Sequence, residues 1–230
     1  MAKSVKPPVA MARRSYDSTR RQQQAQATER VVLDAAGQLF LAQGYARTSL
    51  AEVARVAGVS VETVYGKFRN KLGLLHRLWD VTVGGDDQDV LLHDRPEVLA
   101  IRSEPDLEKR FRLHAAFMTR MSRRIGPFMV MVRAAAEADA SAREMVEMID
   151  AQRLAGLSVM AADAAGTGQL AVTEAECRDF VWSLADGVLW YRLVAQRGWT
   201  DARFEDYMAT ILIATLVRPG VGPTRASLEP

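Results

Sequence analysis

Apolar residues recur at helical spacing along most of this 230-residue chain, and this periodicity is the feature that most restricts its fold. Near the N-terminus, positions i, i+4, i+7 and i+8 form an apolar stripe made of Val32, Ala36, Leu39 and Phe40. Alternating runs of β-branched residues bounded by hairpin turns, which would indicate strands, are nearly absent. The sequence therefore predicts an all-α fold.

Cap residues and glycines divide this pattern into separate helices. The first predicted helix stops near Gly44, because glycine suits the left-handed position that ends a helix. Ser49, Ser60 and Asn70 are expected to cap three further helices, and the fourth helix links this head to the rest of the chain. An irregular acidic stretch is expected from Gly84 to about residue 96. Later helices are predicted at about residues 107–126, 128–138, 141–165 (capped by Ser141), 173–196 and 201–216.

Composition limits the class of protein. Hydrophobic residues make up 49% and charged residues 25%, values typical of a soluble globular protein and not of a disordered or fibrous chain. No run approaches the roughly 18 apolar residues of a membrane span, and the N-terminus lacks the apolar core of a signal peptide. We therefore expect a cytoplasmic protein with no membrane partner. The single cysteine, Cys177, cannot form an internal disulfide.

The near-neutral net charge of +2 conceals an uneven distribution. Residues 1–71 contain twelve Lys and Arg against five Asp and Glu, a net charge of +7, and the remainder carries −5. A basic head on an acidic body suggests that one end binds a polyanion. A basic, disordered tail would give the same count, because residues 1 to about 26 are polar and are expected to be disordered. Charge alone leaves both interpretations open.

The segment from Leu50 to Phe68 has the spacing of a helix-turn-helix. Counted from Leu50, the fifth residue is small, the ninth is glycine and the fifteenth is apolar: Ala54, Gly58 and Val64. The two helices of this motif cross so closely that only a small residue fits at the contact, and the turn needs a residue that accepts a positive φ. The second helix must also turn one apolar face inward.

The longer stretch from Phe40 to Lys71 resembles the N-terminal DNA-binding region of the TetR family of bacterial transcriptional regulators. Its sequence is FLAQGYARTSLAEVARVAGVSVETVYGKFRNK, and the resemblance covers roughly residues 28–75. The features that match are the first helix ending in glycine, the Thr-Ser cap, Ala-Gly-Val-Ser, Thr-Val-Tyr, Phe68 and the Asn-Lys pair. The remainder of the chain resembles the family only in its helical architecture.

The resemblance implies that the third helix enters the major groove of double-stranded DNA. It also implies which residues lie at DNA bases, at phosphates or in the groove: Thr48, Ser49, Ser60, Val61, Glu62, Thr63, Tyr65, Lys67 and Lys71. Other roles remain open: Ser49 and Ser60 also suit helix caps alone, Tyr65 also suits a core, and Glu62 also suits a solvated surface. Glu62, Gly66 and Lys67 depart from the commonest family pattern, which leaves the operator preference undetermined.

The resemblance also implies a dimer, in which the last two long helices pair with those of a second subunit. The implied interface residues are Phe180, Leu184, Val188, Tyr191, Phe204, Met208, Ile211, Leu212 and Thr215. An ordinary core would use some of the same residues. A dimer would place two recognition helices about one DNA turn apart on a near-palindromic site.

Aromatic and methionine residues concentrate in the body and suggest a pocket for a small apolar molecule. The predicted lining residues are Phe111, His114, Phe117, Met118, Met121, Phe128, Met131 and Trp182. At helical spacing these residues equally suit a plain core. His114 is a polar group on an apolar face, where it either orients a ligand or is a satisfied core histidine.

These observations predict four regions: a disordered basic arm (1–26), a three-helix DNA-binding head (27–71), a helical ligand-binding and dimerisation body (72–218) and a flexible tail (219–230). The predicted function is a homodimeric repressor that a small apolar effector releases from its operator. No enzyme, cofactor or metal site is expected, because the three histidines lack metal-ligand spacing and Cys177 lacks a catalytic signature. Two alternatives remain: a ligand-independent regulator whose body only dimerises, and a small-molecule-binding helical protein with a vestigial DNA head.

Overall fold

The computed structural model describes residues 11–85 and 92–220. Over these residues all regular structure is helical, apart from one isolated antiparallel bridge between Leu170 and Val217. The predicted all-α fold class is confirmed. The helices are α1 (Met11–Gln43), α2 (Leu50–Ala57), α3 (Val61–Phe68), α4 (Lys71–Gly84), η1 (Leu92–Asp94), α5 (Pro96–Ser103), α6 (Leu107–Ala136), α7 (Ala140–Ala165), α8 (Glu174–Leu184), α9 (Val188–Trp190), η2 (Tyr191–Gln196) and α10 (Asp201–Leu216).

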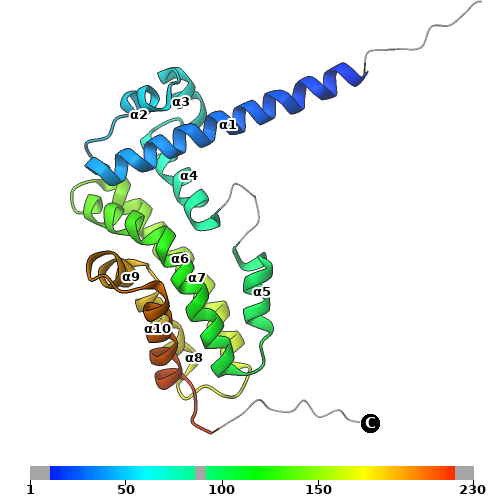
Figure 1. The fold of residues 1–230 in the computed structure, drawn as a ribbon, viewed down its shortest axis with the longest axis vertical. Coiled ribbons are helices and arrows are strands. Elements are labelled where there is room, and N and C mark those ends of the chain that lie inside the picture. Colours follow the sequence, from blue (N-terminus) through cyan, green and yellow to red (C-terminus); the bar gives the residue numbers. More distant parts are fainter. Residues whose placement is uncertain (1–10, 86–91, 221–230) are drawn as a thin grey trace, which may run out of the picture.

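The helices form a head and a body that meet along α4 (Figure 1). In the head, α2 and α3 lie on one side of the long α1, and α4 leads from the head toward the body. In the body, α6 and α7 run side by side, and α8 and α10 pack against them. None of the helices within the described ranges is long and apolar enough to cross a membrane.

Helix α1 begins much earlier than the sequence pattern predicted. The expectation of disorder up to about residue 26 is wrong for residues 11–26, which are helical; residues 1–10 lie outside the described residues, as do residues 221–230 of the expected tail. Residues 20–27 are exposed, so burial does not explain this extension. Its arginine, glutamine and alanine residues are strong helix formers, and they continue a helix that the packed residues beyond already nucleate.

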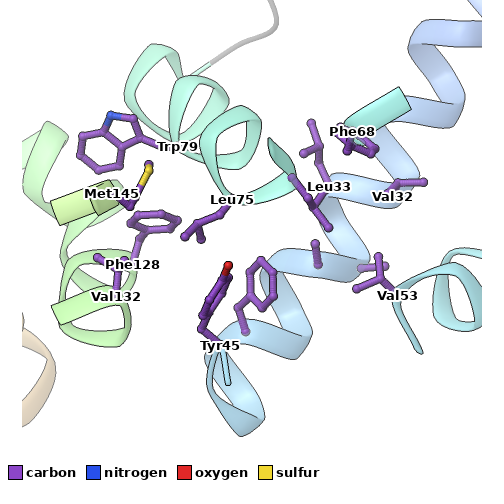
Figure 2. Close-up of a cluster of buried hydrophobic side chains, with 14 of the residues drawn as sticks. Val32, Leu33, Tyr45, Val53, Phe68, Leu75, Trp79, Phe128, Val132 and Met145 are labelled. Carbon is purple, nitrogen blue, oxygen red and sulfur yellow. The ribbon is translucent and has the colours of Figure 1, made fainter. Parts of the chain in front are cut away.

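One apolar core joins the head to the body (Figure 2). Leu75 and Trp79 of α4 are buried in the same cluster as Phe128 and Val132 of α6. The Trp79 and Phe128 rings lie 5.3 Å apart between centroids. The core therefore crosses the predicted boundary between residues 71 and 72, and α4 belongs to both parts.

A second buried cluster lies at the opposite end of the body. It joins the first half of α6 to the end of α7 and to α8, α9 and α10. Its largest fully buried side chains come from α6 and α10: Leu107, Phe111, Phe204, Met208, Leu212 and Leu216. This cluster determines which face of α10 lies inside the protomer.

Helix α6 runs without interruption through Gly126-Pro127, where a helix end was predicted. Pro127 cannot donate a backbone hydrogen bond, but α6 is held by helices on several sides, and this packing outweighs the local preference. Gly126 lies against the backbone of Gly187, so that a Cβ on Gly126 would stand 2.8 Å from the Gly187 carbonyl oxygen. The sequence pattern missed this contact because it joins residues distant in the chain.

Two other predicted boundaries also differ from the structure. Asp139 caps α7 in place of Ser141, because the Asp139 carboxylate accepts from the backbone N–H of Ala142. The predicted helix over residues 173–196 is broken at Gly187, which adopts φ +79, and its last part is the π-helix η2. The expected caps Ser49, Ser60 and Asn70 are confirmed, as is the left-handed conformation of Gly44.

Replacing Gly126 by alanine should destabilise the protein by about 1–3 kcal/mol, because the new methyl group meets backbone atoms that cannot move aside. The matched control is Gly156→Ala in the middle of α7, where a Cβ meets nothing within 4 Å. That change should stabilise the protein by about 0.5–1 kcal/mol through helix propensity. Thermal unfolding of both variants measures the difference, and equal effects would contradict the close helix crossing.

Candidate functional site

Helices α2 and α3 form a helix-turn-helix whose turn depends on Gly58. Gly58 adopts φ +67, and its backbone N–H points to the carbonyls of Ala54 and Arg55 at the end of α2. Val59 continues the turn by donating to the Ala54 carbonyl at 3.0 Å. The small Ala54 is buried, as its position in the motif requires. The structure thus places the predicted small residue and the predicted glycine at the contact and the turn.

Helix α3 turns one face inward and leaves the other open. Val64 and Phe68 are buried, whereas Glu62, Thr63 and Tyr65 are exposed. Tyr65 is 52% exposed, which rules out the core alternative for this ring. The outward face of α3 therefore consists mostly of the side chains that the sequence predicted to meet DNA.

The start of α3 is organised by a small polar network. The Ser60 hydroxyl accepts from the Thr63 backbone N–H at 3.2 Å, and the two hydroxyls lie 3.0 Å apart. The pKa of Glu62 is lowered, because its carboxylate accepts hydrogen bonds from its own backbone N–H and from Ser60. Ser60 and Glu62 thus stabilise the helix N-terminus, and they do so while exposed to solvent.

The end of α3 is fastened to α1 and α4 through Glu29. The Glu29 carboxylate lies 2.7 Å from the Lys67 ammonium and 2.5 Å from Nε of Arg77. Burial alone would raise the pKa of Glu29, but the hydrogen bonds from these two cations outweigh it and lower that pKa. Lys67 also donates to the Ala25 carbonyl at 3.3 Å. The Lys67 ammonium is therefore directed toward α1 and away from the outward face of α3.

Thr48 and Lys71 also have partners inside the protein. Thr48 is only 2% exposed, and its hydroxyl donates to the Gly44 carbonyl at 3.0 Å, so its side chain is directed into the protein. The implied role of Thr48 and Ser49, to present the N-terminus of α2 to the DNA backbone, stays a prediction. The Lys71 ammonium lies 4.1 Å from the centroid of the Tyr45 ring and donates to the Ala46 carbonyl at 3.3 Å. Both residues hold the loop before α2, which leaves Ser49 exposed at that helix N-terminus.

The sequence of the head is similar to that of known bacterial regulators. Residues 32–78 match the family model described as bacterial regulatory proteins, tetR family. The chain is 40% identical over 60 residues to the HTH-type transcriptional regulator AcrR of Shigella flexneri. The matched segment covers 26% of this chain and 28% of AcrR.

The N-terminal region of this chain is therefore of the TetR type.

The likeness to solved structures extends through the body. NalD, the secondary repressor of the MexAB-OprM multidrug efflux pump in Pseudomonas aeruginosa, superposes with a TM-score of 0.67 at 22% identity. That superposition covers 86% of this chain and 99% of NalD. A complex of SmeT with triclosan gives a TM-score of 0.61 at 21% identity, covering 89% and 98% of the two chains. At these identities the likeness establishes the fold of the body.

The structure does not bring the predicted ligand residues into one pocket. Phe111 and Met118 are buried in the second core cluster, where they pack against other side chains. Met121 and Phe128 belong to the first cluster, and Phe117 packs against it. The Trp182 indole N–H donates to the Asp150 carbonyl at 3.4 Å, across the contact between α8 and α7. The prediction of a single pocket lined by all eight residues is therefore wrong, because α6 extends over both clusters.

Two of those residues do line a cavity, at the junction of the head and the body. The cavity has a volume of about 120 Å³ and lies between α1, α4 and α6. Phe128 and Met131 form part of its wall. The rest of the wall comes from α1, α4 and two further residues of α6, Arg124 and Pro127. The sequence pattern gave no signal for this pairing of distant segments.

The predicted dimer residues also divide into two groups. Phe204, Met208 and Leu212 are at most 1% exposed inside the protomer, so their assignment to a dimer interface is wrong. The other residues of that prediction lie at the surface of the protomer, partly or fully exposed: Phe180, Leu184, Val188, Tyr191, Ile211 and Thr215. Tyr207, which the prediction omitted, is 43% exposed on α10. Periodicity alone does not reveal which face of an apolar helix a neighbour covers.

Side chains that could bind a metal ion or act as a nucleophile do not gather into one site in the part of the chain that the structure describes. Over residues 11–85 and 92–220, no group of three or more His, Cys, Asp or Glu side chains is placed to hold a metal ion. Cys177 is buried in α8, and burial raises the pKa of its thiol to about 11. His114 is buried in α6 with no hydrogen-bond partner at Nε2, and burial lowers its pKa to about 4.

Acid should therefore destabilise the protein through His114. Its pKa is about 4 in the folded state and about 6.5 when exposed, so the unfolded chain binds more protons between these values. The free energy of unfolding should therefore be highest above about pH 6.5 and should fall as the pH drops toward 4. At pH 5 it should be about 2 kcal/mol lower than at neutral pH. Urea unfolding at pH 7.5 and pH 5 should show this loss in the wild type and a smaller loss in His114→Leu. The control variant His76→Leu, at a half-buried site on α4, should lose as much stability at pH 5 as the wild type. If His114→Leu also loses as much as the wild type, the loss does not come from His114.

Proposed function

We propose that this protein is a DNA-binding transcriptional repressor that acts as a homodimer on a near-palindromic operator and is released by a small apolar effector. The observation that carries the proposal is the exposed face of α3. Thr63 and Tyr65 project from a helix whose opposite face, Val64 and Phe68, is buried in the head. The C-terminal end of α3 is held to α1 and α4, because Glu29 of α1 pairs with Lys67 of α3 and with Arg77 of α4.

On DNA, α3 would occupy the major groove with Val61, Glu62 and Thr63 near base edges. The exposed Tyr65 hydroxyl and the N-terminus of α2 at Ser49 would meet phosphates. Lys67 and Lys71 would contribute mainly by holding the head together, since both ammonium groups already have partners in the protein. Phosphate binding by Lys67 would require it to leave Glu29.

The dimer would form through the exposed sides of α8 and α10. Phe180 and Leu184 of α8 and Ile211 of α10 are partly buried in the protomer and would be covered further by a second copy. Tyr207 adds a large exposed ring to this surface. Pairing there would bring two heads to fixed positions, which a two-half-site operator requires.

A small apolar effector is supported by two observations. SmeT, which shares the fold, forms a complex with triclosan. The cavity between the head and the body of this protein is lined largely by apolar side chains. An effector that favours one arrangement of head and body would change the separation of the two recognition helices.

A second candidate function is a regulator that needs no effector. The observation in its favour is that Phe111 and Met118, predicted to line a ligand pocket in the body, pack in a filled core. Screening apolar compounds for release from DNA separates the two candidates.

Tyr65→Phe should weaken DNA binding about tenfold on operator and on random DNA alike, because one hydrogen bond to a charged phosphate is lost. Thr63→Ala should weaken binding to the operator only and relax the preference at one base position. Fragments selected from random DNA supply the operator, and fluorescence anisotropy measures both affinities. The matched control Tyr207→Phe, at an exposed tyrosine of α10, should leave both unchanged. Equal losses on both DNAs for Thr63→Ala would contradict its role in base readout.

Ala214→Arg should convert the dimer to a monomer, because it places a charge on the exposed side of α10 between the two subunits. The matched control is Ala202→Arg, an exposed alanine at the start of the same helix, on a different side. Sedimentation velocity should give the mass of one chain for the first variant and of two chains for the second. A dimer that survives Ala214→Arg would exclude this side of α10 from the interface.

A further inference from the structure

The N-terminal end of α1 projects from the head beyond its contact with α3 (Figure 1). At that contact, the Lys67 ammonium of α3 donates to the Ala25 carbonyl at 3.3 Å and lies 2.7 Å from the Glu29 carboxylate. Residues 11–24 continue the same helix on the far side of this contact and are called the α1 extension below. At 1.5 Å per residue the extension is about 20 Å long. It therefore begins beside the C-terminal end of α3 and leads away from the core of the head.

The core of the head does not use the described side chains of the α1 extension. Residues 20–24 are exposed, and the first buried side chain of α1 among those described is Val32, two turns further along the helix. Helix propensity explains why the extension is helical, but it does not require arginine in preference to glutamine or alanine. The residue types on its exposed surface are therefore available for binding.

Positive charge is concentrated on the α1 extension. It contains four arginines and one aspartate, a net charge of +3. Arg20 and Arg21 are the two arginines whose side chains are described, and both are exposed. The other two, Arg13 and Arg14, occupy positions seven residues earlier, which is about two helical turns. The four positions therefore form two rows along the helix. Arg21 is one turn before Ala25, so its row lies on the side of α1 that meets α3.

Two rows of arginines on an exposed helix fit a polyanion, and their position favours double-stranded DNA. The extension begins where α3 ends, and the proposed function places α3 in the major groove. Arg21 is one helical turn, about 6 Å, from the Ala25 contact with α3, so the phosphates that border this groove are the anions nearest to it. An anionic membrane fits less well, because an interfacial helix needs a large apolar face. The only apolar residues among the exposed residues 20–27 are two alanines.

We propose that the α1 extension is a second DNA-contacting element, in which Arg20 and Arg21 bind the phosphates that border the groove occupied by α3. This rests on the proposed function, since it requires α3 to lie on DNA. Phosphate contacts carry no base information. The extension therefore raises the affinity for every DNA sequence, makes that affinity more sensitive to salt, and leaves the choice of operator to α3.

The test variant is Arg20→Gln/Arg21→Gln, which removes two charges and keeps residues of good helix propensity. A dimer carries four of these arginines, and each phosphate contact contributes about 0.9 to the slope of log affinity against log salt concentration. Fluorescence anisotropy from about 50 to 200 mM salt should show a slope smaller by about 3–4. At about 100 mM salt, binding to the selected operator and to random DNA should weaken about tenfold or more. Arg20→Lys/Arg21→Lys keeps the charge and should stay within about threefold of the wild type.

The matched control is Lys109→Gln/Arg112→Gln, which removes two charges from exposed positions in the first half of α6. These residues lie at the end of the body opposite the head, so the salt slope and both affinities should stay within about twofold of the wild type. Thermal unfolding checks that the glutamine variants fold, and exposed substitutions should leave the midpoint nearly unchanged. Equal losses of DNA affinity in both glutamine variants would show an effect of net charge alone and would overturn the proposal.

Other partners of the α1 extension give different results. If it binds an anionic membrane, the wild type sediments with vesicles of phosphatidylserine and phosphatidylcholine, Arg20→Gln/Arg21→Gln does not, and their salt slopes on DNA are equal. If it binds the acidic body of a second copy, that variant changes its mass in sedimentation velocity while the slopes stay equal. Either result overturns the proposal. A wild type that binds no DNA overturns the proposed function as well, whereas one that binds DNA with the same slope as the variant overturns only the contact by the α1 extension.

Discussion

The buried contact between α4 and α6 determines where the three-helix head lies relative to the body. Leu75 and Trp79 face Phe128 and Val132 within one apolar core, so α4 cannot move against the body without opening that core. Packed interiors resist continuous deformation and change by discrete rearrangement. A rearrangement of the body would therefore reach α4 through this contact, and a cavity between α1, α4 and α6 lies beside it.

The Glu29 carboxylate provides the polar counterpart of this contact. It holds Lys67 at the end of α3 and Arg77 in α4 at the same time, and its lowered pKa keeps it ionised near neutral pH. The apolar core fixes α4 relative to the body, and Glu29 fixes α3 relative to α4. The orientation of α3 is thus connected to the body through two successive contacts, one apolar and one ionic.

Local features of the fold were predictable and non-local ones were not. The caps Ser49 and Ser60 and the left-handed Gly58 followed from the sequence, because each depends on a few neighbouring residues. The continuation of α6 through Pro127 and the break at Gly187 did not follow, because those two segments press against each other only in the folded chain. The same holds for Lys67, whose partner Glu29 is 38 positions earlier in the sequence.

The sequence by itself determined that this is a helical protein with a TetR-type helix-turn-helix, and which side of α3 faces outward. Those properties depend on the helical period and on residue types at close spacing, which the backbone imposes wherever the helix lies. Only the tertiary structure decided which apolar residues are core, surface or cavity wall. Phe204, Ile211 and Phe128 are alike in pattern, yet neighbouring helices bury the first, leave the second at the surface and place the third beside a cavity. An apolar helix can be covered on several sides, and its sequence does not specify which neighbour covers each side.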